Sequence, residues 1–197
     1  MALSSDFPAI FDEQIKRLNE RGAPQHLINA LSSRRAQVLV TATGFPARED
    51  RVPFLPIIPR ALMSIQSQMP LIRFEQACGY TLLDTKKIHD ELGTPSEPYF
   101  IFDIEDGRLF TVTSTLAAEA RIKAAGRSCL TDCEVISLCA HTDVLFHHFV
   151  DAAASRYEDK TKNVTLLLEG QTAKLSSSYI SDKSSDWGTP SCGFRMK

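Results

Sequence analysis

Apolar residues recur at helical spacing in the first part of the chain. Between residues 6 and 21, aromatic and aliphatic side chains return every three or four positions, which predicts an amphipathic helix. Ser5 or Asp6 can cap its start, and Gly22 can end it. Residues 25–40 continue the pattern and predict a second helix, or a helix that runs into a strand. The chain is thus expected to begin as a mainly helical unit.

Proline occupies every third position between Pro53 and Pro59, which places the rings on one edge of a polyproline II ribbon. The remaining edges are also apolar, with Phe54 and Ile57 on one of them. We expect such a ribbon to lie covered against the body of its own domain. The alternative is a Pro-x-x-Pro ligand for an aromatic groove on a partner, but such ligands are normally exposed and flanked by polar residues.

Short helices and strands alternate in the rest of the chain. Tyr99–Ile104 is aromatic and branched on both faces, which predicts an interior strand. Asp106 and Gly107 predict a turn, with residues 109–113 as an antiparallel partner. The other expected elements are helices over 60–69, 84–92 and 115–125, a strand over 80–84, and a hairpin formed by residues 164–168 and 173–180.

Thr131 and Glu134 have the spacing of a capping box and open the best helical pattern in the chain. From there to Val150 the apolar residues fall in one stripe, so an unbroken helix is expected. Thr142 or Asp143 could equally cap a fresh helix.

Together these elements predict an α+β fold, with N-terminal helices followed by an antiparallel sheet with packed helices. A chain of 197 residues commonly forms one domain. We expect a single globular domain over residues 1–197, in which 1–45 are mainly helical and 46–197 combine helices and strands with a docked C-terminal tail.

Charge and composition narrow the function classes. The 22 Lys and Arg residues against 24 Asp and Glu residues leave a formal charge of -2, which excludes a nucleic-acid binder that works by bulk positive charge. No apolar leader opens the sequence, and no apolar run approaches the ~20 residues that cross a bilayer. The odd number of cysteines, 5, fits reduced thiols, so we expect a cytoplasmic protein without membrane contact.

One segment gathers residue types that bind transition metals. His141, Asp143, His147 and His148 lie close together in sequence, just after Cys139. On one continuous helix His141 and His148 stand about 10 Å apart, too far to share an ion, and only Asp143 with His147 has the spacing of a ligand pair. We therefore expect no metal and no other cofactor, and keep a metal-dependent enzyme built on the His141–His148 segment as an alternative.

The end of the chain concentrates residues that are uncommon in a frayed terminus. Trp187, Cys192 and Phe194 are interleaved with glycine and proline, so we expect a docked tail whose aromatic side chains are buried. Cys192 is a candidate nucleophile if His141 serves as its base and Arg195 lowers its pKa.

Arginines in the first third of the chain are further candidates for a ligand-binding site. A guanidinium binds phosphate or carboxylate groups in bidentate fashion, but acidic residues lie among these arginines, so a solvated ion-pair surface is the simpler explanation. The candidate ligand-binding residues are Arg51, Arg60, Trp187 and Arg195.

Common catalytic motifs are missing from the sequence, which has no glycine-rich nucleotide loop, zinc-protease motif or hydrolase elbow. We expect a domain that binds a small molecule or a protein partner without catalysis. An enzyme that uses Cys192 as nucleophile and His141 as base is the alternative. The sequence does not predict the oligomeric state.

Several segments, spread over most of the chain, resemble a known family when they are taken together. They are Phe11–Gly22, Arg51–Pro59, Pro98–Ile104, Gly126–Arg127, Leu130–Thr131, His141 and Trp187–Arg195. Together they resemble an uncharacterised family of unknown function, best represented in bacteria. The resemblance implies that the proline ribbon and the tail belong to a shared architecture, and it implies no activity or cofactor. The chain departs from the family at Ser176–Ser178, where aromatic residues are expected, and at Cys129–Cys133, which is richer in cysteine.

Overall fold

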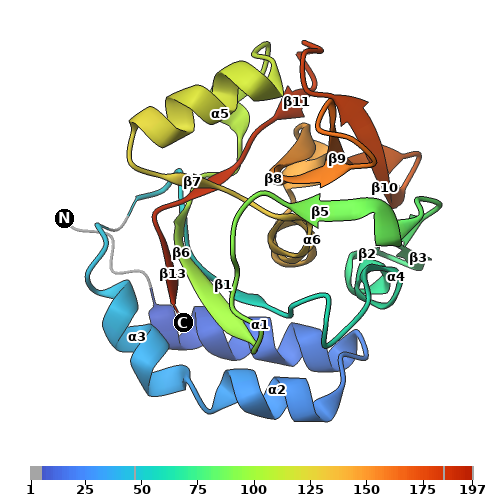
Figure 1. Ribbon diagram of the computed structural model, residues 1–197. Helices are drawn as coiled ribbons and strands as arrows, with labels where there is room; N and C mark the ends of the chain where they lie inside the picture. Colours follow the sequence, from blue (N-terminus) through green and yellow to red (C-terminus); the bar gives the residue numbers. More distant parts are fainter. Residues whose placement is uncertain (1–5, 47, 184, 197) are drawn as a thin grey trace.

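The computed structural model describes residues 6–46, 48–183 and 185–196. Its centre is helix α6 (Asp132–His141), which has β-sheets on either side (Figure 1). Among the described residues, the small sheet contains, in spatial order, β1 (Val52–Ile57), β6 (Tyr99–Ile104) and β13 (Phe194–Met196). The large sheet contains β11 (Trp187–Gly188), β8 (Phe149–Tyr157), β9 (Lys162–Glu169), β10 (Thr172–Tyr179) and β4 (Tyr80–Thr81), with β5 (Ile88–Asp90) also paired to β8.

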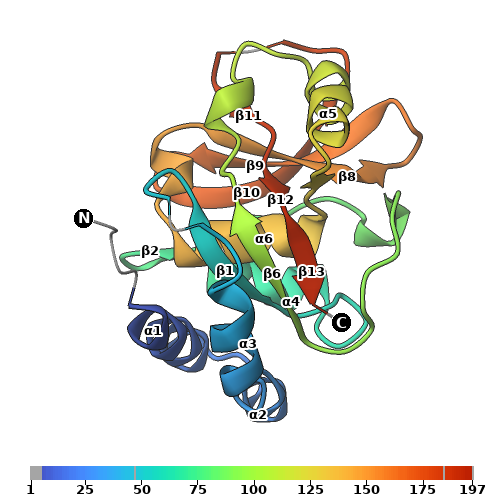
Figure 2. The same ribbon diagram turned by 90° about the vertical axis from the view of Figure 1, so that its left-hand side faces the viewer.

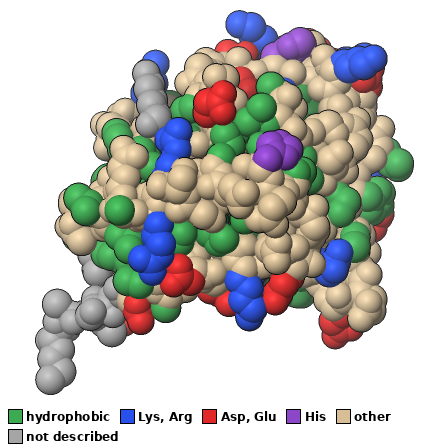
Figure 3. All heavy atoms as spheres, turned by 90° about the horizontal axis from the view of Figure 1, so that it is seen from below, with side chains coloured by type: hydrophobic (Ala, Val, Ile, Leu, Met, Phe, Trp, Pro, Cys, Tyr) green, Lys and Arg blue, Asp and Glu red, His purple; other side chains and the backbone are tan. Residues whose placement is uncertain are grey.

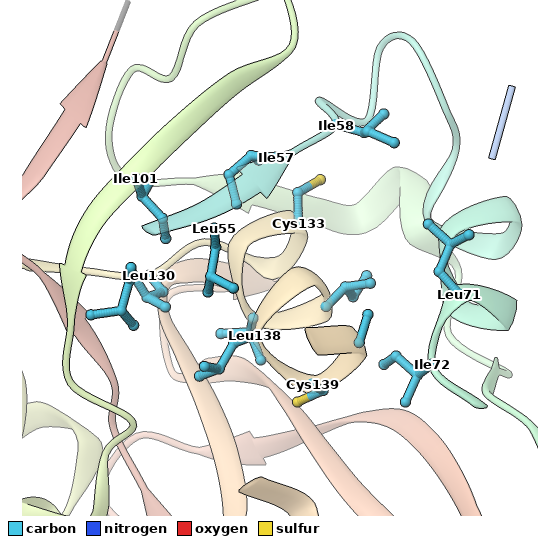
Figure 4. Packing of buried hydrophobic residues seen from close by; sticks show 14 of the residues in the cluster. Leu55, Ile57, Ile58, Leu71, Ile72, Ile101, Leu130, Cys133, Leu138 and Cys139 are labelled. Carbon is cyan, nitrogen blue, oxygen red and sulfur yellow. The ribbon is translucent and has the colours of Figure 1, made fainter. Parts of the chain in front are cut away.

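Helix α6 is buried from Asp132 through Ala140, because both sheets pack against it. Aliphatic side chains surround the helix in Figure 4, where Cys133 lies on the side of β1 and Cys139 on the opposite side. The predicted capping box is confirmed, since the Glu134 carboxylate accepts a hydrogen bond of 2.8 Å from the backbone N–H of Thr131.

The helix ends at His141, so the prediction of an unbroken helix to residue 150 is wrong. Thr142 is extended (φ -130°, ψ 177°), and the chain then forms the 3₁₀ turn η4 (Val144–Phe146) and enters β8. A run of buried apolar residues does not distinguish a continuous helix from a helix followed by a buried strand. Residues 149–157 form a strand because they pair with β9.

Helices α1 (Phe7–Glu20) and α3 (Arg35–Ala42) pack against β1 on the outer face of the small sheet, and α2 (Gln25–Ser32) packs against α1 (Figures 1 and 2). The predicted first helix is confirmed: the Asp6 side chain caps it, and Ser5 lies outside the described residues. The segment 25–40 divides into two helices and does not run into a strand. On the solvent face, basic and acidic side chains lie side by side (Figure 3), as in the Arg35–Asp12 pair at 2.9 Å.

The proline ribbon forms β1, which pairs antiparallel with β6. Phe54, Leu55 and Ile57 are fully buried, so the prediction that this segment is internal is confirmed, whereas the predicted polyproline II conformation is wrong because pairing with β6 makes the segment a β-strand. Proline lacks a backbone N–H and is tolerated in a sheet only at an edge. In the described residues β1 pairs with β6 alone, and that edge position accommodates Pro56, whose carbonyl accepts a hydrogen bond from the Ser137 hydroxyl of α6.

The α+β class is confirmed, but the large sheet is mixed and not antiparallel, because β4 runs parallel to β10 and β11 runs parallel to β8. The hairpin of β9 and β10 and the helix α5 (Thr115–Ala124), which Ser114 caps, agree with the predictions. Four predicted elements are shorter or of another type. The strand expected over 80–84 is limited to β4, and the other three are replaced by α4 (Ile65–Gln68) with η1 (Met69–Leu71), by η2 (Thr85–Lys87) followed by β5, and by η3 (Arg108–Phe110). The remaining strands are β2 (Arg73–Phe74), β3 (Ala77–Cys78), β7 (Ser128–Cys129) and β12 (Ser191–Cys192).

The C-terminal tail is docked, as predicted, but mainly through its backbone. Strand β11 joins the large sheet, β12 pairs with β7, and β13 joins the small sheet, so the tail crosses from one sheet to the other (Figure 2). Cys192 and Met196 are buried, whereas Trp187 is half-buried and Phe194 is 45% exposed. The expectation that both aromatic side chains would be buried is therefore wrong. Among the described residues, no helix combines the length and hydrophobicity that a membrane span needs.

Candidate functional site

A cavity of about 160 Å³ opens where the loop after β1, the end of β5 and the start of α6 meet. We call it the Arg60 cavity. Its lining residues include Arg60, Asp90, Thr94, Ser96, Tyr99 and Cys133. In Figure 4 the Cys133 sulfur points away from the axis of α6, on the same side as Ile58. The cavity combines charged, hydroxyl and aromatic groups, and such groups can fix the orientation of a polar ligand.

Arg60 holds two carboxylates at this cavity. One of its terminal nitrogens, Nη2, contacts the Asp90 carboxylate and lies 3.2 Å from Oδ1 of Asp132, while Nη1 donates to the Ile88 carbonyl at 3.0 Å. Ser155 of β8 links the Asp90 carboxylate to the backbone of Asp132: its hydroxyl donates to Oδ1 of Asp90 at 2.6 Å and accepts from the backbone N–H of Asp132 at 2.9 Å. One guanidinium thus faces two carboxylates, and the cluster is negative when both are ionised.

Asp132 is the most perturbed group of this cluster. Its side chain has no exposed surface, and burial raises its pKa to about 6, with the neighbouring Asp90 adding to the rise and Arg60 opposing it. Its Oδ2 atom has no hydrogen-bond partner among the described residues. Burial also disfavours the charge on Arg60, but Asp132 and Asp90 outweigh that effect and raise the pKa of Arg60. Groups of this kind beside a cavity are candidates for function.

Arg195, another predicted ligand-binding residue, directs its guanidinium to partners inside the protein. Its guanidinium donates to both carboxylate oxygens of Glu134, at 2.7 and 2.8 Å, and to the carbonyl of Cys129 at 2.6 Å. The Tyr99 hydroxyl donates to the same carboxylate at 2.9 Å, and burial raises the pKa of Tyr99. Arg195 therefore neutralises a buried carboxylate behind the Arg60 cavity.

Arg51 and Trp187 lie elsewhere. Arg51 is 3.4 Å from Asp103, whose carboxylate it shares with Arg127 and whose φ of 53° is unusual for a residue other than glycine. Trp187 pairs with Phe149 at one end of β8, whereas β5, which carries Asp90, pairs with the other end. The structure does not bring the predicted ligand-binding residues into one site, and Arg60 is the member that lines the cavity.

Cys192 and His141 lie near opposite ends of α6. The charged neighbours of Cys192 include Glu134 in the first turn, and burial raises the pKa of its thiol to about 12. His141 is the last residue of the helix, where burial, with Arg17 and Arg21, lowers its pKa to about 3. The helical rise from residue 134 to residue 141 is about 10 Å. The structure does not bring the thiol and the imidazole together.

The other histidines do not converge either. His147 faces Asp143 at 3.4 Å on the surface, and Nε2 of His148 lies 3.9 Å from Asp106, a residue of the turn after β6. Burial disfavours the charge on His148, but Asp106 and the Phe149 carbonyl outweigh it and raise its pKa. In the described parts of the chain, no group of three or more His, Cys, Asp or Glu side chains is placed to hold a metal ion.

Sequence reasoning identified Arg60 but missed both of its carboxylate partners. Asp132 occupies the first turn of a helix, where acidic residues are common, so its identity carried no functional signal. Asp90 lies in a segment predicted as helix that forms β5. No family model, curated protein or solved structure matches this chain. The candidate site therefore rests on its geometry.

Proposed function

We propose that the protein binds a small polar molecule in the Arg60 cavity. The observation that carries the proposal is the ion cluster of Arg60, Asp90 and Asp132: Arg60 and Asp90 are partly exposed and line the cavity, and Asp132 is fully buried. A buried ion pair adds little net stability compared with apolar residues of the same volume, so stability alone does not account for the cluster. A cavity of about 160 Å³ has room for several water molecules or for a small ligand.

Binding without catalysis is the function that these groups support best. The thiol at the cavity belongs to Cys133, and burial raises its pKa well above the ordinary value, which disfavours the thiolate. Arg60 and Asp90 are held in ion pairs, an arrangement suited to orienting a bound molecule. The free thiols of Cys129, Cys133, Cys139 and Cys192 are all buried, which supports our further proposal of a cytoplasmic location.

A thermal-shift screen with charged and neutral metabolites tests the binding proposal. A ligand at 100 times its dissociation constant adds about 2.7 kcal/mol of stability, or roughly 5–10 °C for a chain of this size. Ser96→Phe fills the cavity without changing the ion cluster, and Ser181→Phe, at an exposed serine outside the lining, is the matched control. We expect a metabolite that stabilises the natural protein and the control but not Ser96→Phe. The absence of any such metabolite, or equal stabilisation of both variants, would contradict the proposal.

A further inference from the structure

The geometry points to the chemical class of the ligand: we propose that it carries a protonated amine, which binds against the Asp90 carboxylate in the Arg60 cavity. This inference rests on the proposed function, because it assumes that the cavity holds a ligand. Beyond the proposed function, it specifies the charge of the ligand and which end of the ligand faces the ion cluster.

The first argument is the charge balance. Asp90 and Asp132 share the single guanidinium of Arg60, so one negative charge has no partner when both carboxylates are ionised. The next charges behind the cavity, Glu134 and Arg195, neutralise each other. A cationic ligand would supply the missing positive charge, whereas an anionic ligand would add to the excess in a partly enclosed space.

The second argument is the supply of hydrogen-bond donors and acceptors. Arg60 uses three of its five N–H donors, on the Ile88 carbonyl and on the two carboxylates. The Oδ1 atom of Asp90 accepts from Arg60 and Ser155, but in the described part of the chain Oδ2 of Asp90 and Oδ2 of Asp132 accept no hydrogen bond. The cluster therefore has carboxylate oxygens that lack a donor from the described part of the protein. An ammonium group has three donors and no acceptor, which matches this imbalance.

Three probes of similar size separate ligand charge from ligand shape: ethanolamine, ethylene glycol and glycolate. Their binding is measured by NMR titration of the full chain. We expect ethanolamine to bind at least tenfold more tightly than the other two probes. We also expect Asp90→Asn to weaken ethanolamine binding at least tenfold, while Asp182→Asn, which changes an exposed carboxylate, leaves it unchanged.

A tethered cation gives a second measurement that does not depend on free ligand. Thr94 lines the cavity with Asp90, so Thr94→Lys places an ammonium group there, Thr94→Met a neutral chain of similar length, and Thr94→Glu a carboxylate. The expected order of melting temperature is lysine above methionine above glutamate. This comparison remains informative if Asp90→Asn does not fold.

The pH dependence of ethanolamine binding is a third readout. Asp132 faces Arg60, Asp90 and Cys133, and protonation of Asp132, whose pKa is about 6, removes the excess negative charge. Affinity is therefore expected to fall about tenfold between pH 7.5 and pH 5, if the ionised form alone binds the amine.

The outcomes separate the two proposals. Tighter binding of glycolate, or the reverse order in the Thr94 series, would overturn the amine class and leave a cavity that binds anions. The amine class also fails if a ligand sensitive to Ser96→Phe is found but proves neutral. If no ligand is sensitive to Ser96→Phe, the proposed function itself fails.

Discussion

Asp132 is a carboxylate that the protein buries completely, and its pKa predicts how stability depends on pH. The folded protein binds this proton more tightly than the unfolded chain, because the pKa rises from 3.8 to about 6 on folding. Stability is therefore lost as pH increases from about 4 to about 6, by on the order of 3 kcal/mol from this group.

Asp132→Asn removes that proton-binding group. We expect the stability of this variant, relative to the natural protein, to increase between pH 4 and pH 7, as measured by urea unfolding at each pH. Asp182→Asn, an exposed carboxylate, is the control and should show a constant difference. Parallel curves for Asp132→Asn and the natural protein would contradict a raised pKa of Asp132 in the folded state.

Glu134 and Arg195 form a buried ion pair. Removing Arg195 costs stability through the unpaired charge and through lost packing, and these two costs can be separated. Arg195→Met leaves the Glu134 carboxylate, which has no exposed surface, without its counter-charge and should cost roughly 3–5 kcal/mol. Glu134→Gln in the same chain removes the charge and keeps a residue that can complete the capping box. Urea unfolding should show that the double variant regains part of the loss. If it does not, the cost comes from packing and not from charge.

The cysteines should differ sharply in reactivity. Cys78 is exposed and the other four are buried, and burial raises the pKa of Cys129 and Cys192 to about 12. Iodoacetamide at pH 7.5 should therefore label native protein once, at Cys78, and all 5 thiols after unfolding, as counted by mass spectrometry. Rapid labelling of Cys192 in the native state would instead support its role as a nucleophile.

At the scale of elements, the turn after β6 meets the start of the tail at two glycines. Gly107 has φ of 105°, and a Cβ atom added there would lie 2.8 Å from the backbone carbon of Gly188. Two segments of backbone therefore touch where larger residues do not fit, which sets how closely the turn after β6 approaches β11.

Gly107→Ala should cost about 1–3 kcal/mol more than Gly22→Ala, as measured by thermal unfolding. The matched control is Gly22, with φ of 83° and no atom within 4 Å of the added Cβ. Both variants carry the strain of a positive φ, and Gly107→Ala alone adds a clash with backbone. Equal losses would show that strain, and not close contact, dominates at Gly107.

At the scale of the whole molecule, the tail connects the two sheets, so its removal should affect all of the structure. Ending the chain after Asp186 removes β11, β12 and β13, the buried side chains of Cys192 and Met196, and the partner of Glu134. We expect a loss of about 5 kcal/mol or more, which lowers the melting temperature by at least ~10 °C.

Phe194→Ser is the control for this truncation, because its side chain is 45% exposed. It should cost less than a third of the truncation, as measured by calorimetry. A truncated protein that melts with the natural one would show that the tail is not part of the cooperative unit.

The sequence by itself determined those elements that depend on near neighbours. Helix α1 follows from a one-sided apolar pattern and a local cap at Asp6, and the burial of β1 follows from the apolar residues between its prolines. The capping box of α6 and the hairpin of β9 and β10 depend on residues close in the chain. Such interactions span few residues, so the sequence pattern contains them.

Only the tertiary structure decided where α6 ends, that residues 88–90 form a strand, and how the candidate site is assembled. Each of these depends on pairing across the chain: β8 with β9, β5 with β8, and Arg60 with carboxylates 30 and 72 positions away. A buried apolar run is compatible with helix and strand alike, and a lone arginine has many possible partners. The choice between them is made by packing, because burying Asp132 is tolerable only where Arg60 and Ser155 arrive from other elements to meet it.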